Sequence, residues 1–91
     1  MALTESEARV LAVLAELPFG KASTYDEIAA ALDVAYDAVA RVTPGLIESG
    51  FVKRFGGAKP FRHQVTPAGR KVITQPAYRE VRHQVSGKAK R

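Results

Sequence analysis

Cysteine is absent from the 91-residue sequence, and histidine is represented by His63 and His83. Without cysteine the chain can form neither a disulfide nor a thiolate metal site, so apolar packing must hold the fold together. A lone histidine is far more often a surface or packing residue than a metal ligand. We therefore expect no metal site and no cofactor.

Long apolar runs are also lacking. No stretch approaches the roughly 20 apolar residues that a helix needs to span a bilayer, and the N-terminal sequence MALTESEA lacks the basic and apolar regions of a signal peptide. Apolar residues nevertheless make up 46% of the chain, which is enough for one core of modest size. We expect a cytoplasmic protein with no membrane partner.

Acidic residues are scarce in the second half of the chain. Residues 1 to 50 contain eight acidic and three basic side chains, whereas residues 51 to 91 contain eleven basic side chains and a single acid, Glu80. A strongly cationic segment is the usual electrostatic footprint of a protein that binds a polyanion, because each phosphate neutralised by Lys or Arg releases counterions. The competing interpretation is a solvated surface that only favours solubility.

Groupings of residues that carry out catalysis are missing too. The sequence has no paired carboxylates in a plausible pocket, no glycine-rich phosphate loop, no cluster of metal ligands and no nucleophile with an adjacent base. We therefore do not expect an enzyme, and no catalytic residue is predicted.

Residues 24 to 43 have the pattern of a helix-turn-helix. Ile28 and Leu32 lie one turn apart on the first helix, and Val39 begins the buried row of the second. Asp33 occupies the turn, where a left-handed backbone is required and aspartate is tolerated better than most residues.

Two capping boxes predict where helices begin. Thr4 is followed three residues later by Glu7, and Thr24 is followed by Glu27 in the same way. In this arrangement each side chain accepts a hydrogen bond from the backbone of the other residue at the start of a helix. The sequence therefore predicts a helix over residues 4 to 17 and another that starts at Thr24.

The helix that starts near Tyr36 is predicted to be the recognition helix. Arg41 could reach a guanine or a phosphate, and Tyr36 could contact a thymine methyl group. Pro44 removes a backbone donor at a cost of about 3 kcal/mol within a helix, so we expect a kink or break there and a short helix up to Gly50. The side chains predicted to face outward are Tyr36, Asp37, Ala40, Arg41 and Thr43.

A β-hairpin is predicted over residues 51 to 66, with strands at 51 to 55 and 61 to 66 around a glycine-containing turn. A hairpin that directly follows a recognition helix is the wing of a winged helix. The basic residues of this predicted wing are Lys53, Arg54, Lys59 and Arg62.

The C-terminal part is predicted to form further helices. Thr66 and Pro67 start a fourth helix that Pro76 ends, which places a winged helix-turn-helix domain at residues 1 to 75. Residues 76 to 91 are predicted to be a short basic helix and a flexible tail, GKAKR. That helix could dock on the core or on a second copy of the chain, so a homodimer through this segment is one possibility.

Three strings resemble the MarR class of transcriptional regulators. They are VARV at 39 to 42, LIESGFVKR at 46 to 54 and VTPAGRKV at 65 to 72. In that class, similar strings lie at the end of the recognition helix, in the first wing strand and after the wing. The resemblance implies a mainly α winged helix-turn-helix, with a three-helix core, a small β-hairpin and a C-terminal helix, that binds DNA and regulates transcription.

A second, local resemblance covers LPFGKASTYDEIAAAL at 17 to 32. This stretch is similar to the opening of the DNA-binding domain of alkylguanine-DNA alkyltransferases, which transfer an alkyl group to a cysteine in a Pro-Cys-His-Arg motif. Because this chain has no cysteine, alkyl transfer is excluded. The similarity supports a DNA-binding helix-turn-helix and nothing further.

The leading hypothesis is a DNA-binding protein that places the helix at 36 to 43 in the major groove and its basic wing and tail on the phosphates of double-stranded DNA. The alternative is a protein interaction module that uses the acidic helical half. The candidate DNA-binding residues are Thr24, Tyr36, Asp37, Ala40, Arg41, Thr43, Lys53, Arg54, Lys59, Arg62 and His63.

Overall fold

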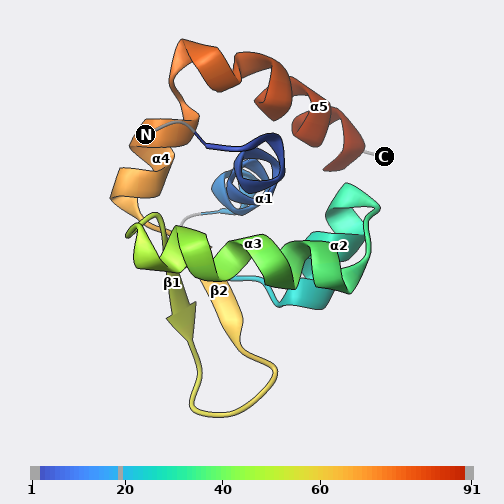
Figure 1. Cartoon of the computed structure of the whole chain (residues 1–91), viewed down its shortest axis with the longest axis vertical. Helices are drawn as coiled ribbons and strands as arrows, with labels where there is room; N and C mark the ends of the chain where they lie inside the picture. The colour runs from blue at the N-terminus through green and yellow to red at the C-terminus, as the bar shows by residue number, and fades with distance from the viewer. Residues whose placement is uncertain (1–2, 19, 90–91) are drawn as a thin grey trace.

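The computed structural model describes residues 3–18 and 20–89, and it is mainly helical with a two-stranded antiparallel hairpin (Figure 1). The molecule measures 36 × 29 × 24 Å along its principal axes. In chain order the elements are α1 (Glu5–Glu16), α2 (Tyr25–Leu32), α3 (Tyr36–Glu48), β1 (Val52–Phe55), β2 (Arg62–Val65), α4 (Pro67–Ile73), the 3-10 helix η1 (Pro76–Tyr78) and α5 (Arg79–Ala89). This architecture confirms the predicted fold class. Among the described residues, no helix is long and apolar enough to cross a membrane.

Helix α1 is the centre of the core, and α2, α3, α4 and α5 all pack against it (Figure 1). Its apolar stripe includes Leu11 and Leu14, which are almost entirely buried. Full burial of a leucine side chain contributes about 1.5–3 kcal/mol to the free energy of unfolding. Ile28 from α2 and Ile73 from α4, also fully buried, belong to the same cluster.

Both predicted capping boxes are present. The Thr4 backbone N–H donates to Glu7 Oε1 at 2.9 Å, and the Glu7 N–H donates to Thr4 Oγ1 at 3.2 Å. The reciprocal pair at α2 joins Thr24 and Glu27, at 2.8 and 3.2 Å. These bonds satisfy backbone donors that no helical carbonyl can reach. The turn that follows α2 is also as predicted, because Asp33 is left-handed with φ 57° and ψ 48°.

The predicted break at Pro44 is wrong, because α3 continues through this residue to Glu48. Pro44 lies on the exposed side of the helix. On the opposite side Val39, Thr43 and Leu46 are each buried to 1% exposure or less. Burial of this continuous stripe outweighs the lost backbone hydrogen bond.

Thr43, predicted to face outward, is therefore fully buried. It lies four residues after Val39 and three before Leu46, which places all three on one helical face. The Thr43 hydroxyl donates to the Val39 carbonyl at 2.7 Å, so its polar atom is satisfied inside the core. Thr43 cannot contact DNA in this conformation.

Gly45 gives a stability prediction within the same helix. Its backbone φ is not positive, and an added Cβ would contact only Glu7 Oε2, at an ordinary 3.7 Å. Because alanine loses less backbone entropy than glycine in a helix, we expect Gly45→Ala to raise the free energy of unfolding by about 0.5–1 kcal/mol. Thermal unfolding measures this effect, and a lower melting temperature would contradict the prediction.

The hairpin is joined to the helix-turn-helix at its base. Strands β1 and β2 pair in register, with Val52 opposite Val65 and Arg54 opposite His63. Ser23, just before α2, adds an isolated bridge to β2 through backbone hydrogen bonds with His63 of 2.9 and 2.7 Å. The loop that precedes α2 therefore holds the base of the wing.

The C-terminal segment packs on the core of its own chain. Val85 of α5 is buried against α1, and the Leu3 backbone N–H donates to the Tyr78 hydroxyl at 2.9 Å. Helix α5 also extends through Gly87, where the flexible tail was predicted to begin, as far as Ala89. The last two residues of that predicted tail lie outside the described residues.

Candidate nucleic-acid interface

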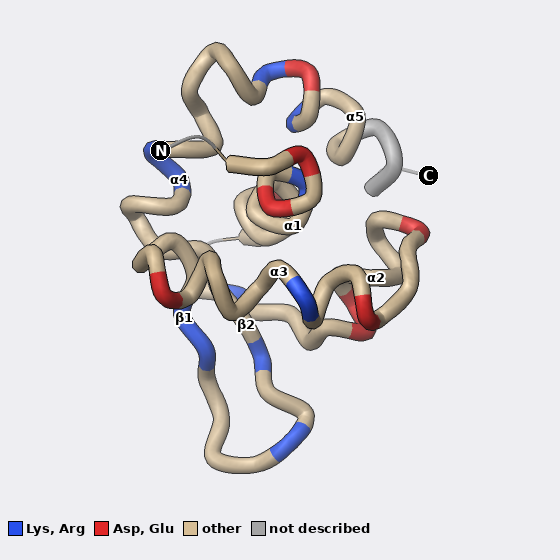
Figure 2. Tube along the Cα trace, viewed as in Figure 1, with Lys and Arg blue, Asp and Glu red and all other residues tan. Residues whose placement is uncertain are grey.

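Helix α3 and the wing form one side of the molecule, and α5 lies on the opposite side of α1 (Figure 1). The wing, defined here as residues 52 to 65, projects beyond α3. Figure 2 shows basic residues along both arms of the wing, and acidic residues concentrated around α2 and the start of α3. The charge split along the sequence is therefore also a split in space.

The exposed surface of α3 is small. Tyr36, its first residue, is 50% exposed, and Asp37 and Arg41 are exposed beside it. Ala40 is half-buried and presents little surface. Of the α3 side chains predicted to contact DNA, three are therefore fully available, and Arg41 is the cation among them.

The wing cations are exposed, and two of them lie over aromatic rings. Lys53 Nζ is 5.3 Å from the ring centroid of Phe55, and the Arg54 guanidinium carbon is 4.9 Å from that of Phe61. A cation held over a ring keeps its charge available to a ligand while its side chain loses some freedom. The wing therefore presents positive charge on a partly ordered surface.

Arg62 differs from the other wing cations because an acid already accompanies it. Its Nη1 lies 3.4 Å from Glu27 Oε1 and 3.5 Å from the Ala22 carbonyl oxygen. Both charged side chains are more than half exposed, so this ion pair is weak. Arg62 is thus less available to phosphate than Lys53, Arg54 or Lys59.

Two other predicted contact residues are occupied or buried. The hydroxyl of Thr24, which is 8% exposed, accepts the Glu27 N–H and serves as the cap of α2. The prediction that the His63 side chain contacts DNA is wrong for this conformation, because His63 is 1% exposed. It lies on the core-facing side of β2, like Val65 two residues later.

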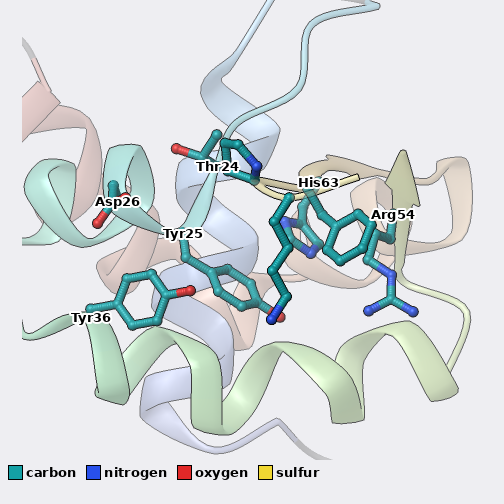
Figure 3. Close-up of a pocket in the computed structure, with 9 residues that line it drawn as sticks. Thr24, Tyr25, Asp26, Tyr36, Arg54 and His63 are labelled. Atoms are coloured by element: carbon teal, nitrogen blue, oxygen red, sulfur yellow. The ribbon is translucent and has the colours of Figure 1, made fainter. Parts of the chain in front are cut away.

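A cavity of about 470 Å³ separates the wing from the starts of α2 and α3 (Figure 3). Tyr25 and Tyr36 line its helical side, and Arg54 and Lys59 line its wing side. Tyr25 was missed by sequence reasoning. It follows a helix cap and belongs to no apolar repeat, so no local signal marked it.

The Tyr25 ring is stacked on the imidazole of His63, with centroids 4.5 Å apart and planes inclined by 7°. Burial lowers the pKa of His63; the Ser23 backbone opposes this shift and Arg54 adds to it. Burial also raises the pKa of the Tyr25 phenol, with Arg54 opposing the shift and Tyr36 adding to it. Neutral forms of both rings are therefore favoured.

The helices, the turn and the hairpin together define a winged helix-turn-helix. No family model and no curated protein sequence matches this chain. Solved structures do match it. A variant of ZitR from Lactococcus lactis superposes with a TM-score of 0.72 at 22% identity, over 97% of this chain and 60% of that chain.

Two further structures carry the same fold. Wild-type ZitR in complex with DNA gives a TM-score of 0.71 at 19% identity, covering 99% of this chain and 60% of that chain. AdcR, a zinc-dependent MarR family transcriptional regulator in its Zn(II)-bound state, gives 0.61 at 23% identity, covering 98% and 56%. At these identities the likeness establishes the fold. The chain spans about 60% of the length of the ZitR structures that it matches.

Proposed function

We propose that this protein binds double-stranded DNA and acts as a transcriptional regulator. The observation that carries the proposal is the placement of exposed wing cations beside the exposed start of α3, on one side of a winged helix-turn-helix. ZitR, which shares this fold, was crystallised with DNA. In the proposed complex α3 enters the major groove and the wing lies on the phosphate backbone.

The affinity of this complex is mainly electrostatic. Tyr36, Asp37 and Arg41 are few residues for reading bases, whereas Lys53, Arg54 and Lys59 are all free to neutralise phosphates. Counterion release then makes the binding constant fall steeply as salt is added. Fluorescence anisotropy with a labelled random-sequence duplex at several salt concentrations tests this mechanism, and binding that hardly changes between low and physiological salt would refute it.

Arg41 is the proposed reader of sequence. Arginine forms a bidentate contact with guanine O6 and N7, worth about 1–3 kcal/mol of discrimination between bases. We expect Arg41→Ala to weaken binding to the preferred duplex about 5- to 100-fold and to flatten the preference at one or two positions. Selection from a random duplex library with both proteins measures this, and an unchanged preference would remove Arg41 from the reader set.

A protein interaction module is the second candidate function, and the exposed acids favour it. Asp26 and Asp37 lie at the starts of α2 and α3, close to the surface that would meet DNA, and they oppose a polyanion. A gel shift at moderate salt is compared with affinity capture using the same protein. Absence of DNA retention together with a stoichiometric protein partner would favour this second function.

A further inference from the structure

Three aromatic rings connect the wing to α3, and we call them the aromatic ladder: His63 in β2, Tyr25 at the start of α2 and Tyr36 at the start of α3. His63 and Tyr25 are stacked face to face at 4.5 Å, and the Tyr25 and Tyr36 rings meet edge to face at 5.6 Å and 74°. Figure 3 shows Tyr25 between the other two rings. Each offset or edge contact between rings is worth about 0.5–1.5 kcal/mol beyond the burial of its area.

One end of the aromatic ladder is fixed and the other reaches the surface. His63 is 1% exposed, and its backbone is bonded in both directions to Ser23. Tyr36 is 50% exposed on the helix proposed to enter the groove. The ladder therefore runs from the buried base of the wing to the edge of the reading surface.

The imidazole of His63 acts in the ladder through its flat face. Neither ring nitrogen has a hydrogen-bond partner among the described residues, although both are buried. A buried polar atom without a partner destabilises a fold by about 1–3 kcal/mol. The stack with Tyr25 is the side-chain interaction that offsets this cost.

We propose that His63 is a positioning residue for DNA binding, which fixes the wing relative to α3 through the aromatic ladder. This inference rests on the proposed function. When two contact elements are held in one orientation, a duplex that engages one is already placed against the other, and less freedom is lost on binding. Without the ladder, the wing cations and α3 bind a duplex as loosely coupled elements.

A double-mutant cycle tests this coupling. Lys59→Gln, at the wing tip, is made in the wild-type and in the His63→Ala background, and duplex affinity is measured for all four proteins. We expect the loss caused by Lys59→Gln to be at least about threefold smaller in the His63→Ala background. Arg41→Ala on α3 is the matched control, and its loss should be equal in both backgrounds. His63→Phe keeps a flat ring on Tyr25 and should restore the full Lys59 effect.

A second measurement needs no DNA. Amide hydrogen exchange at Ser23 and residue 63, which are bonded across the bridge, is expected to accelerate about tenfold or more in His63→Ala and to recover in His63→Phe. The amide of Leu11, in the core, should stay protected in each variant, which separates release of the wing from global unfolding. If His63→Ala does not fold, Tyr25→Leu replaces it, because it removes the stack from a partly exposed position.

The pH profile distinguishes positioning from packing alone. The charged groups near the imidazole are Arg54 from β1 and, on α2, the phenol of Tyr25; neither favours a second positive charge. Because the folded pKa of His63 lies below its usual value of about 6.5, bridge protection should be complete above that pH and decrease as the pH falls through the folded pKa. His63→Phe should abolish this decrease.

The outcomes separate the two proposals. If the wild-type protein does not bind duplex DNA, the proposed function fails, while amide exchange and its pH profile still decide whether His63 holds the wing. If the wild-type protein binds DNA but Lys59→Gln has the same effect in both backgrounds, the positioning role is overturned. Unchanged exchange at Ser23 and residue 63 in His63→Ala would overturn it as well.

Discussion

Replacement of Lys53, Arg54, Lys59 and Arg62 by glutamine together is expected to lower the affinity for duplex DNA on the order of 100-fold at low salt. Each phosphate contact contributes about 0.9 to the slope of the logarithm of the binding constant against that of salt concentration. The slope should therefore become shallower by up to about four contacts' worth. Because Arg62 already lies beside Glu27, its share should be the smallest of the four.

Anisotropy titrations at several salt concentrations measure both quantities. The matched control compares two variants that each lose two charges: Lys53→Gln with Lys59→Gln on the wing, and Lys71→Gln with Arg79→Gln on α4 and α5. All four side chains are exposed, so folding should be unaffected. A wing mechanism predicts that the first pair loses far more affinity than the second. Equal losses would mean that net charge, and not the position of the wing, governs binding.

Gly69→Ala is expected to lower the free energy of unfolding by about 3 kcal/mol or more. Gly69 is buried where α4 crosses the base of the wing. A Cβ at this position would overlap the carbonyl oxygen of Phe51 and would lie 2.9 Å from Val65 Cγ2. The backbone at Phe51 cannot move aside easily, because its carbonyl also accepts the Thr66 N–H at 3.0 Å.

Thermal unfolding by circular dichroism measures this loss, and in a domain of this size about 4–8 °C of melting temperature corresponds to each kcal/mol. Gly57→Ala is the control, since an added Cβ there meets no atom within 4 Å and the backbone φ is not positive. A change of melting temperature in Gly69→Ala no larger than in Gly57→Ala would show that α4 and the wing base do not meet as described.

Local rules were sufficient for much of this fold. The helix starts at Thr4 and Thr24 follow from reciprocal hydrogen bonds between residues three apart, and the left-handed Asp33 follows from the geometry of one turn. Each depends on neighbours in the sequence alone. The order of helices and hairpin was predictable for the same reason.

The errors arose where distant residues decide the outcome. Pro44 is a helix breaker by local rules, but the core contacts of Val39 and Leu46 keep α3 continuous. That burial also turns Thr43 inward. Tertiary packing overrides local propensity at these positions, and a single sequence does not reveal how strongly.

The candidate site was predictable in its charges and not in its geometry. Exposed wing cations could be recognised from composition and from the hairpin pattern. The stack of His63 on Tyr25 could not, because it joins residues far apart in the sequence that β2 and α2 bring together. Two aromatic rings on separate elements leave no periodic pattern that would pair them.

The dimensions of the molecule limit the length of DNA that one copy can cover. Its longest axis is 36 Å, and base pairs in a duplex are spaced by about 3.4 Å, so a single copy has a footprint of about ten base pairs. This is close to one helical turn. A selected consensus longer than that would therefore report a stoichiometry above one protein per site, and the spacing of its repeats would give the distance between neighbouring copies.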